Sequence, residues 1–403
     1  MNHLLSGYTV LDFTHFLAGP ACTRLMAELG ADIIKVESPS GDATRNMPFS
    51  KNGRSGYFVQ QNRGKKSISI DLRSSEGLEI IKSLLPKVDV LIENFSPGTM
   101  SRLGIGWEEV RKINPRVVMC SVSTFGQTGP LSKLVGYDPI GQAFAGITDL
   151  IGEKDGPPCY PMFSLGDTLT GAHAFGAINA SLLYRERSGK GQYLDISILD
   201  CYFHHHDLSP QIVSLSERAL VPTRNGRMHF TLAPTGIFRG KKRYMFIVAL
   251  EHQWPDFCRV INKEELIKDQ RFIDNAARVD NVEELVEEIE SWIRSMPDDD
   301  AAITALMEGR IPVAPVLSIT EAMDHPHLVE RGTIRTISDR VLPDFEVPGC
   351  PLRFSEFPEP LELEAPFLGE HNRDVLEHLL GFSEEKIKTL EESGVLSTES
   401  KTS

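Results

Sequence analysis

The chain has 403 residues, enough for more than one domain, with 41% hydrophobic and 24% charged residues. This composition is typical of a globular protein and disfavours disordered or fibrous chains. Lys and Arg total 42 against 56 Asp and Glu, a formal net charge of −14. This acidic balance disfavours a broad nucleic-acid-binding face.

The sequence gives no sign of a membrane span or of export. No run of eighteen apolar residues is present, and the N-terminus lacks both a basic start and a long apolar stretch. The six cysteines are scattered without paired spacing. We therefore expect reduced thiols, a cytoplasmic location and no metal site.

Strands and helices are predicted to alternate over the first half of the chain. Strands are expected at 8–13, 32–36, 67–72, 88–92, 117–122 and 193–198, and helices at 21–29, 75–85, 107–113 and 168–187. Ala18-Gly19-Pro20 is interpreted as a break before the first helix, Gly30 as the glycine that ends it, and Ser75 as a cap. This alternation predicts an α/β fold with a mostly parallel sheet, whose carboxyl edge is the usual place for function.

A different pattern begins near residue 225. Residues 237–250 are typical of an antiparallel hairpin turning at Gly240-Lys241-Lys242, and helices are expected at 253–261, 281–295 and 299–308. The pattern predicts a second, smaller α+β domain.

Common catalytic signatures are missing. The chain has no G-x-G-x-x-G after a strand, no G-x-x-x-x-G-K-[ST] and no G-x-S-x-G. His204-His205-His206 are adjacent on a predicted helix, where they point in three directions and cannot share one metal ion.

Asp167, in Gly166-Asp167-Thr168, is the most suggestive single residue. It lies where a loop becomes a helix rich in small residues. One interpretation is an ordinary N-cap aspartate. The other is a carboxylate held at a helix start for use as a covalent nucleophile, with glycines that admit a ligand.

Two further features lie at predicted strand ends. Asn94 follows the strand 88–92, where it is either part of a simple turn or faces a ligand. Several cations lie in or beside strand-end loops and would suit phosphates if they gathered on one edge: Lys35, Arg45, Arg63, Lys65, Lys66 and Arg102.

Taken in order, short segments along nearly the whole chain resemble class III CoA-transferases (the CaiB/BaiF family, which includes formyl-CoA transferases). They include Asp12-Phe13-Thr14-His15, Ala18-Gly19-Pro20-Ala21-Cys22-Thr23, Asn62-Arg63-Gly64-Lys65-Lys66, Glu93-Asn94-Phe95, Phe125-Gly126-Gln127-Thr128-Gly129-Pro130, Gly136-Tyr137-Asp138, Gly166-Asp167 and Leu368-Gly369-Glu370-His371-Asn372.

The resemblance implies a mechanism and a fold. Asp167 would attack the acyl-CoA thioester to give a mixed anhydride, then carry CoA as an aspartyl-CoA thioester before an acceptor carboxylate takes it. The implied fold is a large Rossmann-like domain (1–205), a small α+β domain (225–330) and a C-terminal segment (331–403) returning to the large domain. Two chains would interlock as a homodimer.

The resemblance also implies ligand contacts. The expected CoA contacts are Ala18, Lys65, Lys66, Asn94, Phe95, Arg102 and Tyr137, with Lys65, Lys66 and Arg102 as a basic rim. Acyl-CoA and small carboxylic acids are the expected partners, with no nucleic acid. The acyl pocket is expected around Leu17, Phe49, Tyr57, Tyr137 and Met228, and the segment Arg227 to Pro234 lies where relatives carry a lid loop.

Departures from the family pattern leave alternatives open. Formyl-CoA transferases carry a glutamine where this chain has Leu17, which disfavours formate and oxalate. An α-methylacyl-CoA racemase would use a histidine where this chain has Tyr137, although Glu251 resembles the racemase glutamate. A catalytically silent CoA-binding scaffold is the remaining alternative. The presence of Asp167 at the position of the family nucleophile argues against it.

Overall fold

A computed structural model describes residues 3–47 and 49–399. The chain forms two compact units. The first takes in Met1–Ile147, Pro161–His206 and Val329–Ser403, and the second takes in Thr148–Tyr160 and Asp207–Leu328. The domain boundaries 1–205, 225–330 and 331–403 stay a prediction.

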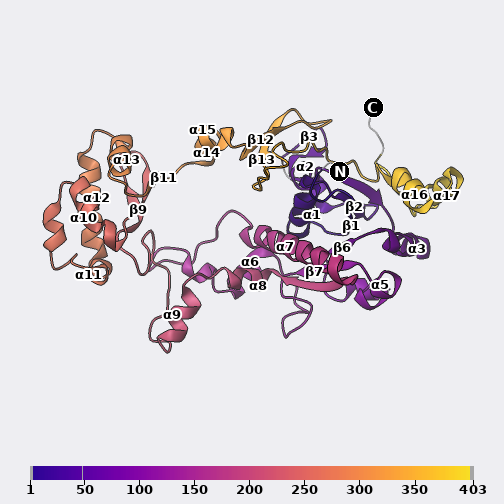
Figure 1. The fold of residues 1–403 in the computed structure, drawn as a ribbon, viewed down its shortest axis with the longest axis horizontal. Coiled ribbons are helices and arrows are strands. Elements are labelled where there is room, and N and C mark those ends of the chain that lie inside the picture. The colour runs from indigo at the N-terminus through magenta and orange to yellow at the C-terminus, as the bar shows by residue number, and fades with distance from the viewer. Residues whose placement is uncertain (1–2, 48, 400–403) are drawn as a thin grey trace. The chain divides into compact units, whose positions relative to one another are not determined.

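The first unit is built on a six-stranded sheet in the order β5-β2-β1-β6-β7-β8 (Figure 1). Every neighbouring pair of strands is parallel, as the sequence predicts. The strands are β1 (Thr9–Asp12), β2 (Asp32–Glu37), β5 (Lys65–Ser69), β6 (Val90–Glu93), β7 (Val118–Ser123) and β8 (Gln192–Ser197).

Helices cover both faces of this sheet, because alternate strand residues are apolar on each side. On one face, Val10 and Ile33 form a core with α1 (Ala18–Glu28) and α7 (Leu165–Ser188). On the other, Leu11 and Ile34 pack with α3 (Ser75–Leu84), α5 (Trp107–Ile113), α16 (Asn372–Leu380) and α17 (Glu384–Glu392). The result is a three-layer α/β/α arrangement.

Two helix boundaries differ from the prediction. The break expected at Ala18-Gly19-Pro20 is wrong, because α1 begins at Ala18 and Pro20 lies in its first turn. Proline is tolerated there, since a first-turn N–H has no partner within the helix. The cap of α3 is Ser74, whose hydroxyl accepts from the Gly77 N–H at 2.9 Å, and not Ser75.

Shorter elements connect these layers. They are η1 (Ala43–Asn46), β3 (Ser50–Lys51), β4 (Arg54–Ser55), α2 (Gly56–Asn62), η2 (Leu85–Lys87), α4 (Thr99–Arg102), α6 (Asp138–Phe144), α8 (Ile198–His204), β12 (Ile334–Ile337) and β13 (Phe345–Pro348). The chain passes from the second unit back to the first within α15 (Pro326–Glu330).

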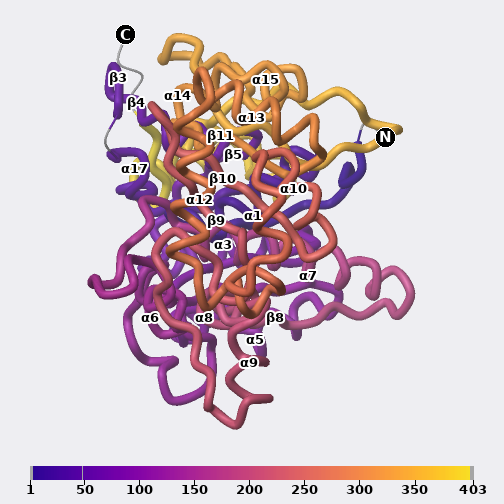
Figure 2. Tube along the Cα trace, turned by 90° about the vertical axis from the view of Figure 1, so that its left-hand side faces the viewer, coloured from indigo at the N-terminus to yellow at the C-terminus, as the bar shows by residue number. Residues whose placement is uncertain are grey.

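The C-terminal segment lies against the N-terminal strands (Figure 2). The Asn372 side chain accepts from the Ser69 N–H at 2.8 Å and donates to the Ser397 carbonyl at 2.8 Å. The Gly64 N–H donates to the Glu364 carbonyl at 2.7 Å. These bonds tie the end of the chain to β5.

The second unit contains a three-stranded antiparallel sheet in the order β11-β10-β9. Its elements are η3 (Thr148–Leu150), α9 (Ser209–Leu215), β9 (Thr235–Arg239), β10 (Tyr244–Val248), η4 (Glu251–Gln253), α10 (Trp254–Val260), η5 (Glu264–Lys268), α11 (Asn275–Asp280), α12 (Val282–Ser295), α13 (Asp299–Glu308), β11 (Val313–Pro315) and α14 (Ile319–Met323). The predicted hairpin is confirmed, with Tyr244 opposite Arg239. Among the described residues, no helix has the length and apolarity needed to cross a membrane.

Candidate active site

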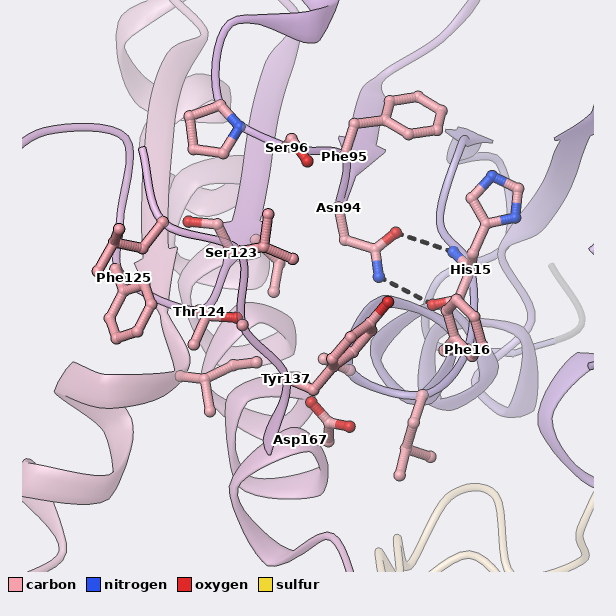
Figure 3. A pocket seen from close by; sticks show the side chains of 18 of the residues that line it. His15, Phe16, Asn94, Phe95, Ser96, Ser123, Thr124, Phe125, Tyr137 and Asp167 are labelled. Atoms are coloured by element: carbon pink, nitrogen blue, oxygen red, sulfur yellow. Dashed lines mark hydrogen bonds between the residues drawn. The ribbon is translucent and has the colours of Figure 1, made fainter. Parts of the chain in front are cut away.

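The strand order places a switch point between β1 and β6, where the chain turns to opposite sides of the sheet. Ligands of open α/β sheets bind outside the carboxyl ends of strands at such a point. A cavity of about 410 Å³ opens there. It is lined by the segments that follow β1, β6 and β7, by Tyr137 before α6, and by Asp167 of α7 (Figure 3).

Asn94 joins the two strands that flank the switch point. Its side-chain oxygen accepts from the His15 N–H at 2.8 Å, and its amide nitrogen donates to the His15 carbonyl at 2.8 Å. The Asn94 side chain therefore continues the hydrogen bonding between the two chain segments beyond the ends of β1 and β6. It fixes the wall of the cavity on that side.

Asp167 lies inside the first turn of α7, as the third residue of the helix. The N-cap interpretation is wrong, because Ser164 occupies that position and makes no side-chain capping bond. The Asp167 carboxylate lines the cavity, and in the view of Figure 3 the Tyr137 ring lies between it and the Asn94 amide. A carboxylate at this place can reach a thioester carbonyl held in the cavity.

Burial raises the pKa of Asp167 to about 7, and the nearby Asp138 carboxylate adds to the shift. Desolvation and a like charge both disfavour the ionised form, and the positive end of α7 does not cancel them. The environment therefore marks this carboxylate as unusual among the first-turn acids of the chain. Strongly perturbed groups in clefts are candidates for catalysis.

The helix that carries Asp167 sits close to α1 because of a glycine. A Cβ added at Gly171 would lie 2.7 Å from the Ala18 carbonyl oxygen and 3.0 Å from the Ala21 Cβ. A small residue of α7 thus allows the two helix backbones to approach closely at this crossing. The close approach of α1 and α7 places Asp167 in the same cavity wall as Leu17 and Ala18.

The structure brings five of the predicted site residues to one cavity: Ala18, Asn94, Phe95, Tyr137 and Asp167. The predicted basic residues Lys65, Lys66 and Arg102 are not among the residues that line it. Leu17 of the expected acyl pocket does line it.

Lys65 is fully buried beneath α1. Its ammonium lies 3.1 Å from the Asp12 carboxylate and donates to the Asn62 side chain at 2.9 Å. Burial lowers the pKa of Lys65 to about 8, with Asp12 opposing the shift. In this chain Lys65 balances an internal charge rather than facing solvent.

Lys66 and Arg102 are more accessible. The Lys66 ammonium pairs with Asp32 at 3.1 Å, and its side chain is 38% exposed. The exposed Arg102 donates to the Thr99 hydroxyl at 2.7 Å. The Lys66 ammonium also lies 4.0 Å from the Asp374 carboxylate. The contacts of both side chains are at the surface, so both can move to meet a ligand.

Other residues of the expected acyl pocket have different surroundings. The Phe49 side chain is 97% exposed. Burial and the Asp167 carboxylate raise the pKa of Tyr57 to about 12, which keeps its hydroxyl protonated. Met228 and the segment from Arg227 to Pro234 belong to the second unit.

Phe16 and Phe125 also line the cavity, although neither was predicted from the sequence. Phe16 has a positive φ of 63° and packs edge-on against Tyr137 with ring centroids 6.1 Å apart. Left-handed backbone is costly for a bulky residue, and strain of this kind clusters at functional loops. The signal in the sequence was the position of Phe16 in the loop that follows a predicted strand.

The contact between Asp138 and Tyr202 was not predicted from the sequence either. Tyr202 donates to the two Asp138 oxygens at 2.9 and 3.0 Å, although 64 positions separate the two residues. Nothing in the local sequence links them.

In the described part of the chain, no group of three or more His, Cys, Asp or Glu residues is arranged to hold a metal ion.

Comparison with known proteins identifies the class. A family model described as CoA-transferase family III matches residues 5–372. The chain therefore belongs to CoA-transferase family III, and it is an enzyme of that class. Its fold matches a crystal structure of a CaiB/BaiF family protein from Brucella suis, with a TM-score of 0.82, 32% identity, and coverage of 94% of this chain and 100% of that one.

Three characterised relatives match over most of their length. A succinyl-CoA:glutarate CoA-transferase of Mus musculus is 35% identical, covering 97% of this chain and 90% of the relative. A succinyl-CoA:mesaconate CoA-transferase of Haloarcula hispanica is 34% identical, covering 93% and 96%. A formyl-CoA:oxalate CoA-transferase of Escherichia coli is 32% identical, covering 98% and 99%.

Proposed function

We propose that the protein moves CoA from an acyl-CoA donor to a carboxylic acid through covalent intermediates on Asp167. The observation that carries this proposal is the Asp167 carboxylate lining the switch-point cavity, partly buried and with a raised pKa. A carboxylate with a raised pKa is the more nucleophilic when ionised, and proximity to a bound thioester adds effective molarity.

The steps balance without a redox change or a metal. An Asp167 oxygen attacks the thioester carbonyl, the C–S bond breaks, and a mixed anhydride and CoA thiolate form. The thiolate attacks the aspartyl carbonyl and releases the donor acid, leaving an aspartyl-CoA thioester. The acceptor carboxylate displaces the thiolate to form a second anhydride. The thiolate then attacks the acceptor carbonyl, which gives the new acyl-CoA and frees Asp167.

We infer that CoA lies along the edge formed by Ala18, Asn94 and Phe95, with Tyr137 beside the reacting carbonyl. The five predicted residues that share the cavity support this placement. Lys66 and Arg102, which make only surface contacts in the described chain, are proposed to contact the phosphates. Contact between Lys65 and CoA stays a prediction, and the buried pair with Asp12 gives Lys65 a second role.

We propose dicarboxylic acids of about the size of succinate or glutarate as the acyl groups. Two relatives are named for succinyl-CoA with glutarate or mesaconate. Leu17, Phe16 and Tyr137 give the cavity an apolar wall beside Asp167, which suits a carbon chain better than formate or oxalate. Dicarboxylates keep one charged end after acylation, which distinguishes them from simple fatty acids.

Racemisation has less support in this structure. Glu251, which resembles the racemase glutamate, is ion-paired with the buried Arg278 in the second unit. Tyr137 occupies the position of the racemase histidine.

We also propose that the protein is a homodimer and acts in the cytoplasm. Exposed apolar side chains on the first unit, including Met162, Phe163, Leu183, Tyr184 and Phe203, support a partner surface.

Asp167→Asn tests the proposed function. The variant should lose transfer between succinyl-CoA and glutarate, and hydroxylamine should trap a hydroxamate on Asp167 only in the wild type incubated with acyl-CoA. Asp200→Asn is the matched control, since Asp200 is an exposed first-turn aspartate of α8 that does not line the cavity. Transfer by Asp167→Asn at the wild-type rate would overturn the proposal. A matrix of acyl-CoA donors and acids, read by mass spectrometry, then identifies the substrates.

A further inference from the structure

Asp138 is a buried carboxylate next to the nucleophile, and the mechanism above does not use it. It is 1% exposed and is the first residue of α6. No cation pairs with it within residues 3–47 and 49–399. A buried carboxylate without a cation is costly unless hydrogen bonds compensate.

Two hydrogen-bond donors compensate for its burial, and a third residue holds one of them. The Asp167 N–H donates to Asp138 Oδ2 at 2.8 Å. The Tyr202 hydroxyl donates to Asp138 at 2.9 Å, and the Gln142 amide donates to the Tyr202 oxygen at 3.2 Å. Burial raises the pKa of Tyr202 to about 12, so its hydroxyl keeps the proton that it donates. The start of α6 adds a favourable backbone dipole.

This network is built into the first turn of α7. A Cβ added at Gly166 would lie 2.1 Å from the Tyr202 ring, so only a glycine lets the ring reach Asp138 beneath the helix. Asp138 takes the backbone hydrogen bond that a capping side chain would otherwise make, because Ser164 makes none. The network thus sets where the backbone of Asp167 lies.

We propose that Asp138, held by Tyr202, is the positioning residue of the nucleophile: it fixes the Asp167 backbone and places a second buried carboxylate beside that of Asp167. The inference rests on the proposed function of Asp167. The like charge disfavours the anion of Asp167 and so raises its affinity for an electrophile as well as for a proton. The transfer of the acyl group to Asp167 removes the charge, which relieves the repulsion as the anhydride forms.

The proposal explains why the site tolerates two carboxylates in one buried region. Ground-state repulsion between them disappears when Asp167 becomes an anhydride or a thioester, both of which are neutral. An interaction that is worse in the resting enzyme than in the transition state increases the rate. An asparagine at 138 would keep the acceptor oxygen for the Asp167 N–H but lose this effect.

The test compares pH profiles of kcat/KM for one acyl-CoA, so that titration of the substrate cancels between variants. In Asp138→Asn, the acid limb should move to lower pH by about half a unit or more, and the plateau rate should fall about tenfold. Tyr202→Phe is the matched variant. It removes a hydrogen bond from Asp138 but no charge, so its acid limb should keep the wild-type position.

The outcomes separate the two proposals. An unmoved acid limb in Asp138→Asn, with Asp167→Asn inactive, would overturn the role of Asp138 and leave the nucleophile intact. Transfer by Asp167→Asn would overturn the proposed function itself. If Asp138→Asn does not fold, Asp138→Ser supplies a second uncharged variant with an oxygen acceptor. Hydroxylamine trapping on Asp167 must persist in every folded variant with activity.

Discussion

Asn94 and His15 are joined by two reciprocal hydrogen bonds of 2.8 Å, one to each backbone polar group of His15. The pair spans the switch point between β1 and β6, where the Phe95 and His15 rings also meet with centroids 5.5 Å apart. One side chain therefore ties together the two loops that form a wall of the cavity. Asn94 therefore fixes the shape of the cavity wall, in addition to its proposed contact with CoA.

Asn94→Ala should weaken the use of acyl-CoA. Loss of both bonds frees the loop after β1, at a cost of about 1–3 kcal/mol, because two backbone groups lose their partner. We expect kcat/KM for acyl-CoA to fall at least about tenfold, chiefly through KM. The measurement is steady-state kinetics with one donor varied.

Asn114→Ala is the control for this change. The Asn114 side chain donates to the Leu85 and Val88 carbonyls at 2.9 and 3.0 Å, and Asn114 does not line the cavity. It should lose a similar amount of stability without a change in KM. Equal KM values for wild type and Asn94→Ala would contradict the role assigned to Asn94.

Lys65 and Lys66 are neighbours in sequence with opposite environments, so they provide a matched pair. Lys65→Met leaves Asp12 buried without its cation and should cost about 3–5 kcal/mol of unfolding free energy. Lys66→Met removes partly exposed pairs with Asp32 and Asp374 and should cost less than about 1 kcal/mol. Denaturant unfolding of both variants at one pH measures the difference.

Kinetics of the same two variants separate structure from CoA binding. If Lys66 contacts phosphate, Lys66→Met raises KM for acyl-CoA, and the increase becomes smaller at high salt. A Lys65→Met protein as stable as the wild type would show that the buried pair with Asp12 is not needed. It would then favour the alternative that Lys65 serves the ligand.

These lysines also show what the sequence could and could not predict. The parallel sheet and the glycine after α1 follow from local patterns, since periodicity and turn residues are local properties. The role of Asp167 as nucleophile came from the family resemblance and stays a proposal. Gly30 has a φ of 90° directly after α1, as expected of a helix-ending glycine. The burial of Lys65 depends on Asp12, 53 positions away, and on α1 above it, which no local pattern records.

The contact between Asp167 and Asp138 could not be predicted for the same reason, because it joins residues that are far apart in sequence. The sequence suggests a helix start near Asp167, but the cap position depends on Asp138 taking the Asp167 N–H from another element. Asp138 was visible only as part of Gly136-Tyr137-Asp138. Its contact with Tyr202 required the fold.

Asp167 should lower the stability of the protein at neutral and higher pH. Its folded pKa is about 7, above the value of about 4 in an unfolded chain. The folded state therefore holds the proton more tightly, and the unfolding free energy falls as pH rises from about 4 to 7. Below about pH 4 the Asp167 carboxyl is protonated in both the folded and the unfolded state, so it does not lower the free energy of unfolding.

Asp167→Asn removes this penalty. We expect the variant to be more stable than the wild type by about 2 kcal/mol at pH 8, with a smaller gain at pH 5. The gain is smaller than a fully buried carboxylate would give, because Asp167 is partly open to the cavity. Urea unfolding at both pH values measures it. A gain that is the same at pH 5 and pH 8 would contradict the raised pKa.

Gly171 and Gly176 test the close packing that positions the nucleophile. Gly171→Ala places a methyl group 2.7 Å from the Ala18 carbonyl oxygen, so α1 and α7 must move apart. We expect a loss of about 1–3 kcal/mol in unfolding free energy and a lower kcat, because α7 carries Asp167. Gly176→Ala meets nothing within 4 Å on the same helix. It should stabilise the protein by about 0.5–1 kcal/mol through helix propensity and leave kcat unchanged. If both substitutions had the same effect on kcat, the α1–α7 crossing would not control the position of Asp167.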